Sequence, residues 1–156
     1  MPNTGAAPGQ NDPDLRRAMA AVRVGPMYER NGQVMRRILQ RNMEGREPGV
    51  QGRYDLQVLL VSAIELLGFT NQGLASRIRV TASATWVLSS LSDPPQVLER
   101  GSARTLDAFN VPDLQFFASD ASNEDMQRRL VVELSDRVTV GVAIALRRHL
   151  TATAAA

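Results

Sequence analysis

Two arginines and three hydroxyl residues alternate with apolar residues in the segment RIRVTASATWVL, positions 77–88. The polar set is Arg77, Arg79, Thr81, Ser83 and Thr85, and Val87 alone breaks the pattern. Such alternation is typical of a half-buried β-strand, because successive side chains point to opposite faces of a sheet. Guanidinium and hydroxyl groups suit the binding of phosphates, carboxylates or a polar protein surface. A strand face that is simply exposed to water has the same pattern.

Residues that could support catalysis or hold a metal are scarce. The single histidine, His149, has no nearby partners for a catalytic triad. The absence of cysteine excludes disulfides, thiolate metal sites and cysteine nucleophiles. Asp120, Glu124 and Asp125 lie at the expected start of a helix, where acidic residues are common in any case, and no phosphate-binding glycine loop occurs. We therefore expect a binding or structural protein rather than an enzyme, with no metal and no cofactor.

The composition fits one folded domain. The 156 residues are 44% hydrophobic and 22% charged, which is ordinary for a folded protein with a single core. All 18 basic residues are arginine, a bias that a GC-rich genome would also produce. The net charge of +2 is too small to indicate a dedicated nucleic-acid binder. The chain as written has no secretory signal pattern, and no segment approaches the roughly 20 apolar residues that span a bilayer.

Hydrophobic periodicity predicts elements in the order β-α-β-β-β-α. Strands are expected at 21–24, 52–66, 77–88 and 97–110, and helices at 29–45 and 122–149. The segment 138–146 is apolar all round and could be a strand, but we favour a helix because the amphipathic pattern runs into it unbroken. Asn31 is expected to cap the first helix, and Glu124 to pair with Arg128 one turn later. Gly101 suggests a bulge or a close backbone approach.

These elements predict an α+β fold. Three consecutive strands joined by short turns should form an antiparallel meander, and the two helices should cover one face of the sheet. The result is a two-layer sandwich with a four-stranded, mostly antiparallel sheet. We expect a flexible tether at 1–14, one domain at 15–150 and a disordered tail at 151–156.

The order and spacing of several segments resemble the lipopolysaccharide-assembly lipoprotein family (LptE, also called RlpB). In VRVGPMYERNGQVMRRIL, a strand leads into Glu29-Arg30-Asn31-Gly32-Gln33 and then Met35-Arg36, as in the family's D-R-x-G-Q-x-L-R-N-like helix start. YDLQVLL, RIRVTASATWVL, VLERGSARTLDAFN and FASDASNEDMQRRLVVELSD follow in the family's order, so the resemblance covers about residues 20–149. The chain departs from the family in lacking the lipidated cysteine and export signal. Phe117 replaces a commoner tyrosine, and Met126 a small residue.

The resemblance implies a non-enzymatic partner of the outer-membrane β-barrel (LptD-type) that delivers lipopolysaccharide to the cell surface. In that family the lipoprotein plugs the barrel, assists its assembly and contacts lipopolysaccharide, at the periplasmic face of the outer membrane. Membrane attachment would occur only through an N-terminal lipid anchor, which this chain lacks. Because a barrel lumen is polar, the expected contact residues are Arg77, Arg79, Thr81, Ser83, Thr85, Arg100 and Arg104. A second expected surface joins the turn 69–73 to segment 107–117 and includes Phe69, Asn71, Leu114, Phe116 and Phe117.

Two other functions fit the same elements. An auxiliary lipoprotein of a lipid-transporting ABC system would show similar strands and helices with a different partner. A small RNA-binding α+β domain would also place arginines on an open sheet. Such domains stack bases on sheet aromatics, and the polar face of segment 77–88 has none. We therefore expect no nucleic-acid partner.

Overall fold

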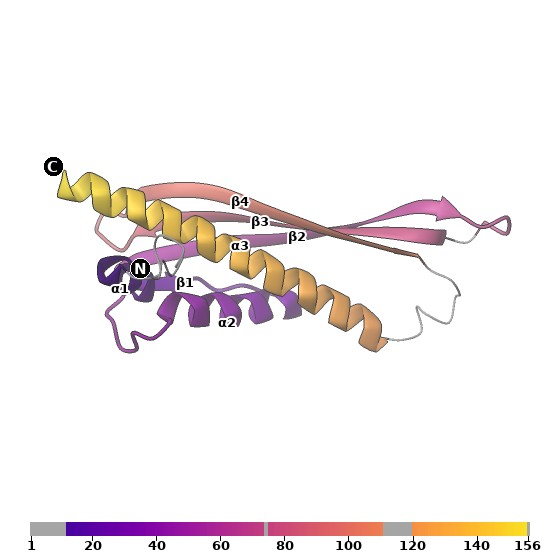
Figure 1. The fold of residues 1–156 in the computed structure, drawn as a ribbon, viewed down its shortest axis with the longest axis horizontal. Helices are drawn as coiled ribbons and strands as arrows, with labels where there is room; N and C mark the ends of the chain where they lie inside the picture. The colour runs from indigo at the N-terminus through magenta and orange to yellow at the C-terminus, as the bar shows by residue number, and fades with distance from the viewer. Residues whose placement is uncertain (1–11, 74, 111–119, 156) are drawn as a thin grey trace, which may run out of the picture.

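The computed structural model describes residues 12–73, 75–110 and 120–155. Its elements, in chain order, are α1 (Pro13–Ala20), β1 (Val22–Val24), α2 (Arg30–Glu44), β2 (Tyr54–Phe69), β3 (Ala75–Ser90), β4 (Val97–Asn110) and α3 (Asp120–Ala154). The molecule is elongated, and α1 lies at the same end as the C-terminal end of α3 (Figure 1). The predicted order β-α-β-β-β-α is confirmed, with one helix added in front.

The strands form a single mixed sheet in the order β1-β2-β3-β4. β1 pairs with β2 in parallel, whereas the β2–β3 and β3–β4 pairs are antiparallel. The parallel pair follows from α2, which carries the chain back across the sheet between β1 and β2, while tight hairpins can join only antiparallel strands. The predicted α+β sandwich with a mostly antiparallel sheet is therefore confirmed.

The helices pack on one face of this sheet. Every second residue of β3, from Ile78 to Leu88, is buried against them together with Met35 and Leu39 of α2 and Leu134 of α3. Fully burying a Val, Leu, Ile or Met side chain contributes about 1.5–3 kcal/mol. The opposite face of the sheet, which we call the outer face, is covered by none of the described helices.

The apolar segment 138–146 is helical, as predicted, and belongs to the middle of α3. Val138 and Val142 are fully buried, and Leu146 continues the same buried stripe one turn later. Trp86 is 4% exposed beneath this helix, so it belongs to the core and does not offer a stacking surface. The apolar residues on the other side of the segment are not buried, since Val140 is 59% and Ile144 49% exposed.

The N-terminal end of the domain differs from the expected tether at 1–14. Residues 13 and 14 already belong to α1, while residues 1–11 lie outside the described chain. Asp12 caps this helix by accepting hydrogen bonds from the backbone N–H groups of Asp14 (3.0 Å) and Leu15 (3.4 Å). Pro13 fits the first helical position, since its missing N–H is not needed there. Burial of Leu15 and Ala18 against the core makes this short helix stable.

Two other helix ends also differ from the sequence-based predictions. α2 begins at Arg30, one residue before the expected cap Asn31, and its N-cap residue Glu29 makes no side-chain capping bond. Gly45 ends α2 as predicted, with a positive φ of 55°. α3 continues to Ala154, so the expected disordered tail at 151–156 is helical through Ala154.

Candidate partner-binding surface

The five polar residues of segment 77–88 do share the outer face of the sheet. Cross-strand pairing places them in rows, with Thr85 between Leu59 and Ser102, and Ser83 between Val61 and Arg104. Arg77 and Thr85 are exposed, while Arg79 and Ser83 are half-buried. The side of β3 that faces away from the helices is therefore the polar one, as the alternation predicts.

Thr81 is an exception to the expected contact set. It lies on the outer face, yet only 9% of its surface is exposed. Its direct neighbours on the two flanking strands are Ala63 and Leu106. Because β3 is an inner strand, Thr81 has a neighbouring strand on each side. Its hydroxyl group is therefore poorly placed to meet a partner.

Three arginines give the outer face its free positive charge. Arg77, Arg100 and Arg104 are exposed, and within the described part of the chain their guanidinium groups have no hydrogen-bond or ion-pair partner. Arg100 and Arg104 are four residues apart on β4, about 13 Å along the strand. Arg79 differs, because its guanidinium donates to the carboxylate of Glu65 at 3.1 Å. Each of these three guanidinium groups can thus bind an external anion without breaking an internal contact.

The outer face is more apolar than the sequence-based prediction implies. Leu59 is 65% exposed, Val61 54% and Leu106 58%, and they lie directly beside the hydroxyl row of β3. The apolar run 58–61 in β2 contains the signal for this arrangement, since Leu59 and Val61 make the outer face of that strand apolar as well. The candidate surface therefore combines hydroxyl groups, guanidinium groups and aliphatic side chains.

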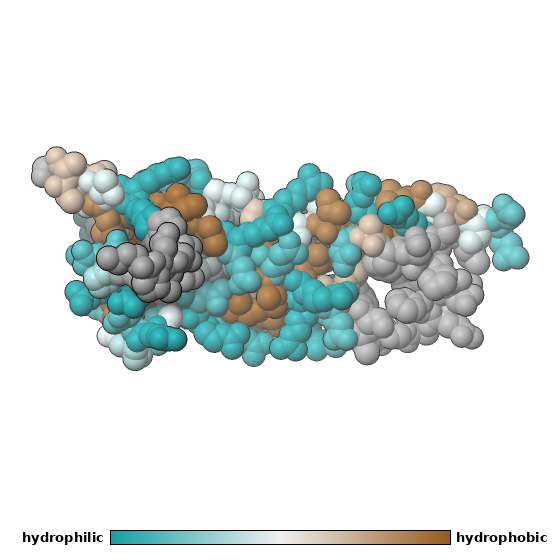
Figure 2. Space-filling view, in the orientation of Figure 1, coloured by the Kyte–Doolittle hydropathy of each residue, from teal (hydrophilic) through white to brown (hydrophobic). Residues whose placement is uncertain are grey.

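The second expected surface is described only in part. Phe69 is 64% exposed, and Asn71 is exposed in the turn that follows β2. Leu114, Phe116 and Phe117 lie outside the described residues. At this end the β2–β3 hairpin extends past the helices (Figure 1), and Figure 2 shows hydrophobic residues along its upper edge and hydrophilic residues at its tip.

A groove between α2 and α3 was not predicted. It has a volume of about 1010 Å³. Its arginines are Arg30, Arg37, Arg41 and Arg128, and its apolar residues are Val34, Ile38, Val131 and Val132. The signal in the sequence is the placement of Arg37 and Arg41, which are one helical turn apart and off the apolar stripe of α2.

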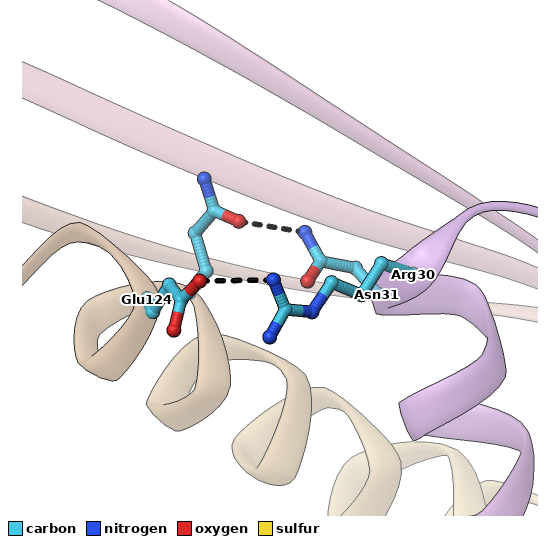
Figure 3. Close-up of polar contacts among 4 residues, drawn as sticks. Arg30, Asn31 and Glu124 are labelled. Atoms are coloured by element: carbon cyan, nitrogen blue, oxygen red, sulfur yellow. Dashed lines mark hydrogen bonds and ion pairs between the residues drawn. The ribbon is translucent and has the colours of Figure 1, made fainter. Parts of the chain in front are cut away.

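Polar contacts bridge the two helices where the groove begins. Arg30 donates to the carboxylate of Glu124 at 2.9 Å, and the Asn31 side chain donates to that of Gln127 at 2.8 Å (Figure 3). Further along, Asn42 donates to the hydroxyl of Thr139 at 3.2 Å. The groove thus has a polar bridge at one end.

Neither a metal site nor a membrane-spanning helix is found in the described part of the chain. No three histidine, aspartate or glutamate side chains there are grouped so that they could hold a metal ion. None of the described helices is both long enough and apolar enough to cross a bilayer.

No protein-family model and no curated protein matches this chain. Solved structures do. A candidate lipoprotein from Caulobacter crescentus is 16% identical with a TM-score of 0.65, covering 86% of this chain and 96% of that one. The rare lipoprotein B of Shewanella oneidensis is 11% identical with a TM-score of 0.57, covering 83% of this chain and 96% of that one. This chain has the rare lipoprotein B fold.

A minor lipoprotein from Acinetobacter baumannii shares the rare lipoprotein B fold as well. It is 13% identical with a TM-score of 0.57, and the match covers 79% of this chain and 88% of that one. At these identities the likeness concerns the arrangement of helices and strands, and it assigns no role to any residue. The contact residues must therefore be argued from the geometry of this chain.

Proposed function

We propose that this chain is a non-enzymatic outer-membrane lipoprotein component that plugs a β-barrel (LptD-type) lipopolysaccharide translocon. In this role it assists assembly of the barrel and contacts lipopolysaccharide during delivery to the cell surface. Three unpaired outer-face arginines, Arg77, Arg100 and Arg104, carry the proposal, because they lie on the side of the sheet that is left uncovered by the described helices. The rare lipoprotein B fold supports it, since the structures that share this fold are named as lipoproteins.

The chemistry of the outer face suits both partners. The lumen of a membrane β-barrel is polar, so hydroxyl groups such as those of Ser83 and Thr85 can exchange hydrogen bonds with lumen side chains. Guanidinium groups form strong, often bidentate contacts with carboxylates and phosphates. Lipopolysaccharide carries phosphates next to acyl chains, and the outer face places Leu59, Val61 and Leu106 close to its arginines.

The test is a comparison of charge-reversal variants. Wild-type protein, Arg77→Glu with Arg79→Glu, and Arg100→Glu with Arg104→Glu are titrated with lipopolysaccharide. Each is also used to co-purify partners from envelope membranes. Losing hydrogen bonds to charged groups costs about 1.5–3 kcal/mol each, so we expect each double variant to bind lipopolysaccharide or the barrel at least about tenfold more weakly. Circular dichroism must show an unchanged fold.

The matched control is Arg16→Glu with Arg46→Glu. Both arginines are exposed and lie away from the outer face, on α1 and after α2, and the pair changes the net charge by the same amount. Control and wild type should bind alike. Equal binding by all four proteins would remove the outer-face arginines from the site. Recovery of an ABC transporter in place of the barrel would contradict the proposed partner.

A further inference from the structure

The edge of β2 is open along most of its length. β1 pairs only with Tyr54–Leu56, and the N–H of Gly25 then donates to the carbonyl of Leu56 at 2.8 Å. Beyond that point β2 is paired only with β3 among the described residues. Tyr54 and Leu56 bond toward β1, so alternation directs the backbone N–H and C=O groups of Val58, Leu60, Ser62, Ile64 and Leu66 to the open edge.

The other edge of the sheet, β4, is protected. Arg137 of α3 donates to the backbone carbonyl of Arg104. α3 also places Arg129 3.9 Å from the carboxylate of Asp107 and Arg148 3.3 Å from that of Glu99. Charged side chains and a covering helix are the usual means by which proteins prevent an edge strand from pairing with another chain.

The edge of β2 has almost none of this protection. Between Val58 and Leu66 the only charged residue is Glu65, and there is no proline. Large apolar side chains are exposed on both faces of this stretch, since Leu59 is 65% and Ile64 67% exposed. The turn end of the hairpin extends past α2 and α3 (Figure 1). On the helix side of β2, Val58 and Leu60 are partly buried against the core, whereas Ser62, Ile64 and Leu66 are exposed. An open, apolar edge of this kind is suited to pairing with another strand.

We infer that this edge pairs with the same edge of a second copy of the chain, antiparallel and centred on Ser62. The open stretch is bounded by Gly25 at one end and by the register shift after Leu66 at the other. Ser62 is the midpoint of 58–66. A two-fold pairing about Ser62 therefore uses the whole open stretch and forms roughly ten backbone hydrogen bonds.

The side chains of this stretch are self-complementary in that register. On the helix side of the sheet, Val58 faces Leu66 of the second copy and Leu60 faces Ile64, while the two Ser62 residues face each other. On the outer face, Leu59 faces Glu65 and Val61 faces Ala63. The two Glu65 carboxylates are about 20 Å apart along the strands, so no like charges meet.

The test uses the absence of cysteine from the chain. Ser62→Cys places two thiols on the two-fold axis, with Cα atoms about 5.5 Å apart, within the range that a disulfide spans. Under mild oxidation we expect Ser62→Cys to form a covalent dimer. The control Ser102→Cys, an exposed serine on the outer face of β4, should stay monomeric. Equal cross-linking of the two variants would overturn the inference.

The dimer should also be lost in variants of the same position. Ser62→Pro removes one N–H that faces the open edge and leaves the β2–β3 ladder intact, and Ser62→Asp sets two carboxylates face to face. Light scattering across a concentration series should show dimers for the wild type and monomers for both variants, with unchanged circular dichroism. A monomeric wild type at every concentration, or dimers that persist in both variants, would refute the pairing. Because the isolated chain is measured without the barrel, this inference and the proposed function can fail separately.

Discussion

The indole ring of Trp86 on β3 lies directly over Gly101 on β4, so that a Cβ atom at Gly101 would be 2.3 Å from Cζ2 of Trp86. The two residues are direct cross-strand partners in a regular stretch of the sheet. Gly141 of α3 approaches the same ring, where a Cβ atom would be 3.0 Å from Cζ2. One large aromatic ring thus fills the space between a strand and a helix, each of which has a glycine there.

Gly101→Ala should destabilise the fold by about 1–3 kcal/mol, because the added methyl group overlaps a rigid, buried ring. Gly141→Ala should cost less, since the overlap is smaller and alanine gains about 1 kcal/mol over glycine in a helix. Urea denaturation measures both free energies of unfolding. Ser102→Ala, one residue from Gly101 on the exposed side, is the control and should change little. A Gly101→Ala protein as stable as the control would show that the ring does not restrict this position.

The polar bridge between α2 and α3 should contribute little to stability. The side chains of Arg30 and Glu124 are 82% and 57% exposed, and exposed ion pairs typically contribute about 0.2–1 kcal/mol. We expect Arg30→Ala to fall in that range, and Leu39→Ala, fully buried on the same helix, to cost about 2–5 kcal/mol. Thermal unfolding of the two variants tests the comparison. A larger loss for Arg30→Ala would assign the docking of α2 to its charges rather than to its apolar stripe.

The sequence allowed the sheet and the two long helices to be predicted because each has a clear period. Residues 77–88 alternate cleanly, and the stripe of α3 continues through the ambiguous segment 138–146. α1 was missed because a helix of eight residues has little intrinsic stability. It forms because Leu15 and Ala18 are buried against distant parts of the chain, and no local pattern contains that information.

The pairing of charges shows the same limit. Spacing along α3 favours a contact between Glu124 and Arg128, whereas the structure pairs Glu124 with Arg30, 94 residues away in sequence. In the same way, alternation places Thr81 on the outer face, but it does not predict that only 9% of this residue is exposed. Faces are set by local geometry and can be predicted. Exposure and ion pairing depend on which elements become neighbours.

Glu65 should restrain one arginine of the proposed contact surface. Its carboxylate pairs with Arg79 at 3.1 Å, and their side chains are 56% and 43% exposed. Glu65→Gln removes the negative charge and leaves Arg79 free to bind an external phosphate. An exposed pair of this kind is worth about 0.2–1 kcal/mol, so the variant should bind lipopolysaccharide about 1.4- to fivefold more tightly, with a steeper loss of affinity as salt is added.

Titration of both proteins with lipopolysaccharide at several salt concentrations measures this effect. The matched control is Glu44→Gln, which removes an exposed carboxylate at the end of α2, away from the outer face, and changes the net charge equally. A gain confined to Glu65→Gln would locate the bound phosphate near Arg79, because a general change in net charge would act through both variants. Unchanged binding by Glu65→Gln, or an equal gain in Glu44→Gln, would exclude Arg79 from the contact and leave Arg77, Arg100 and Arg104 as the candidates.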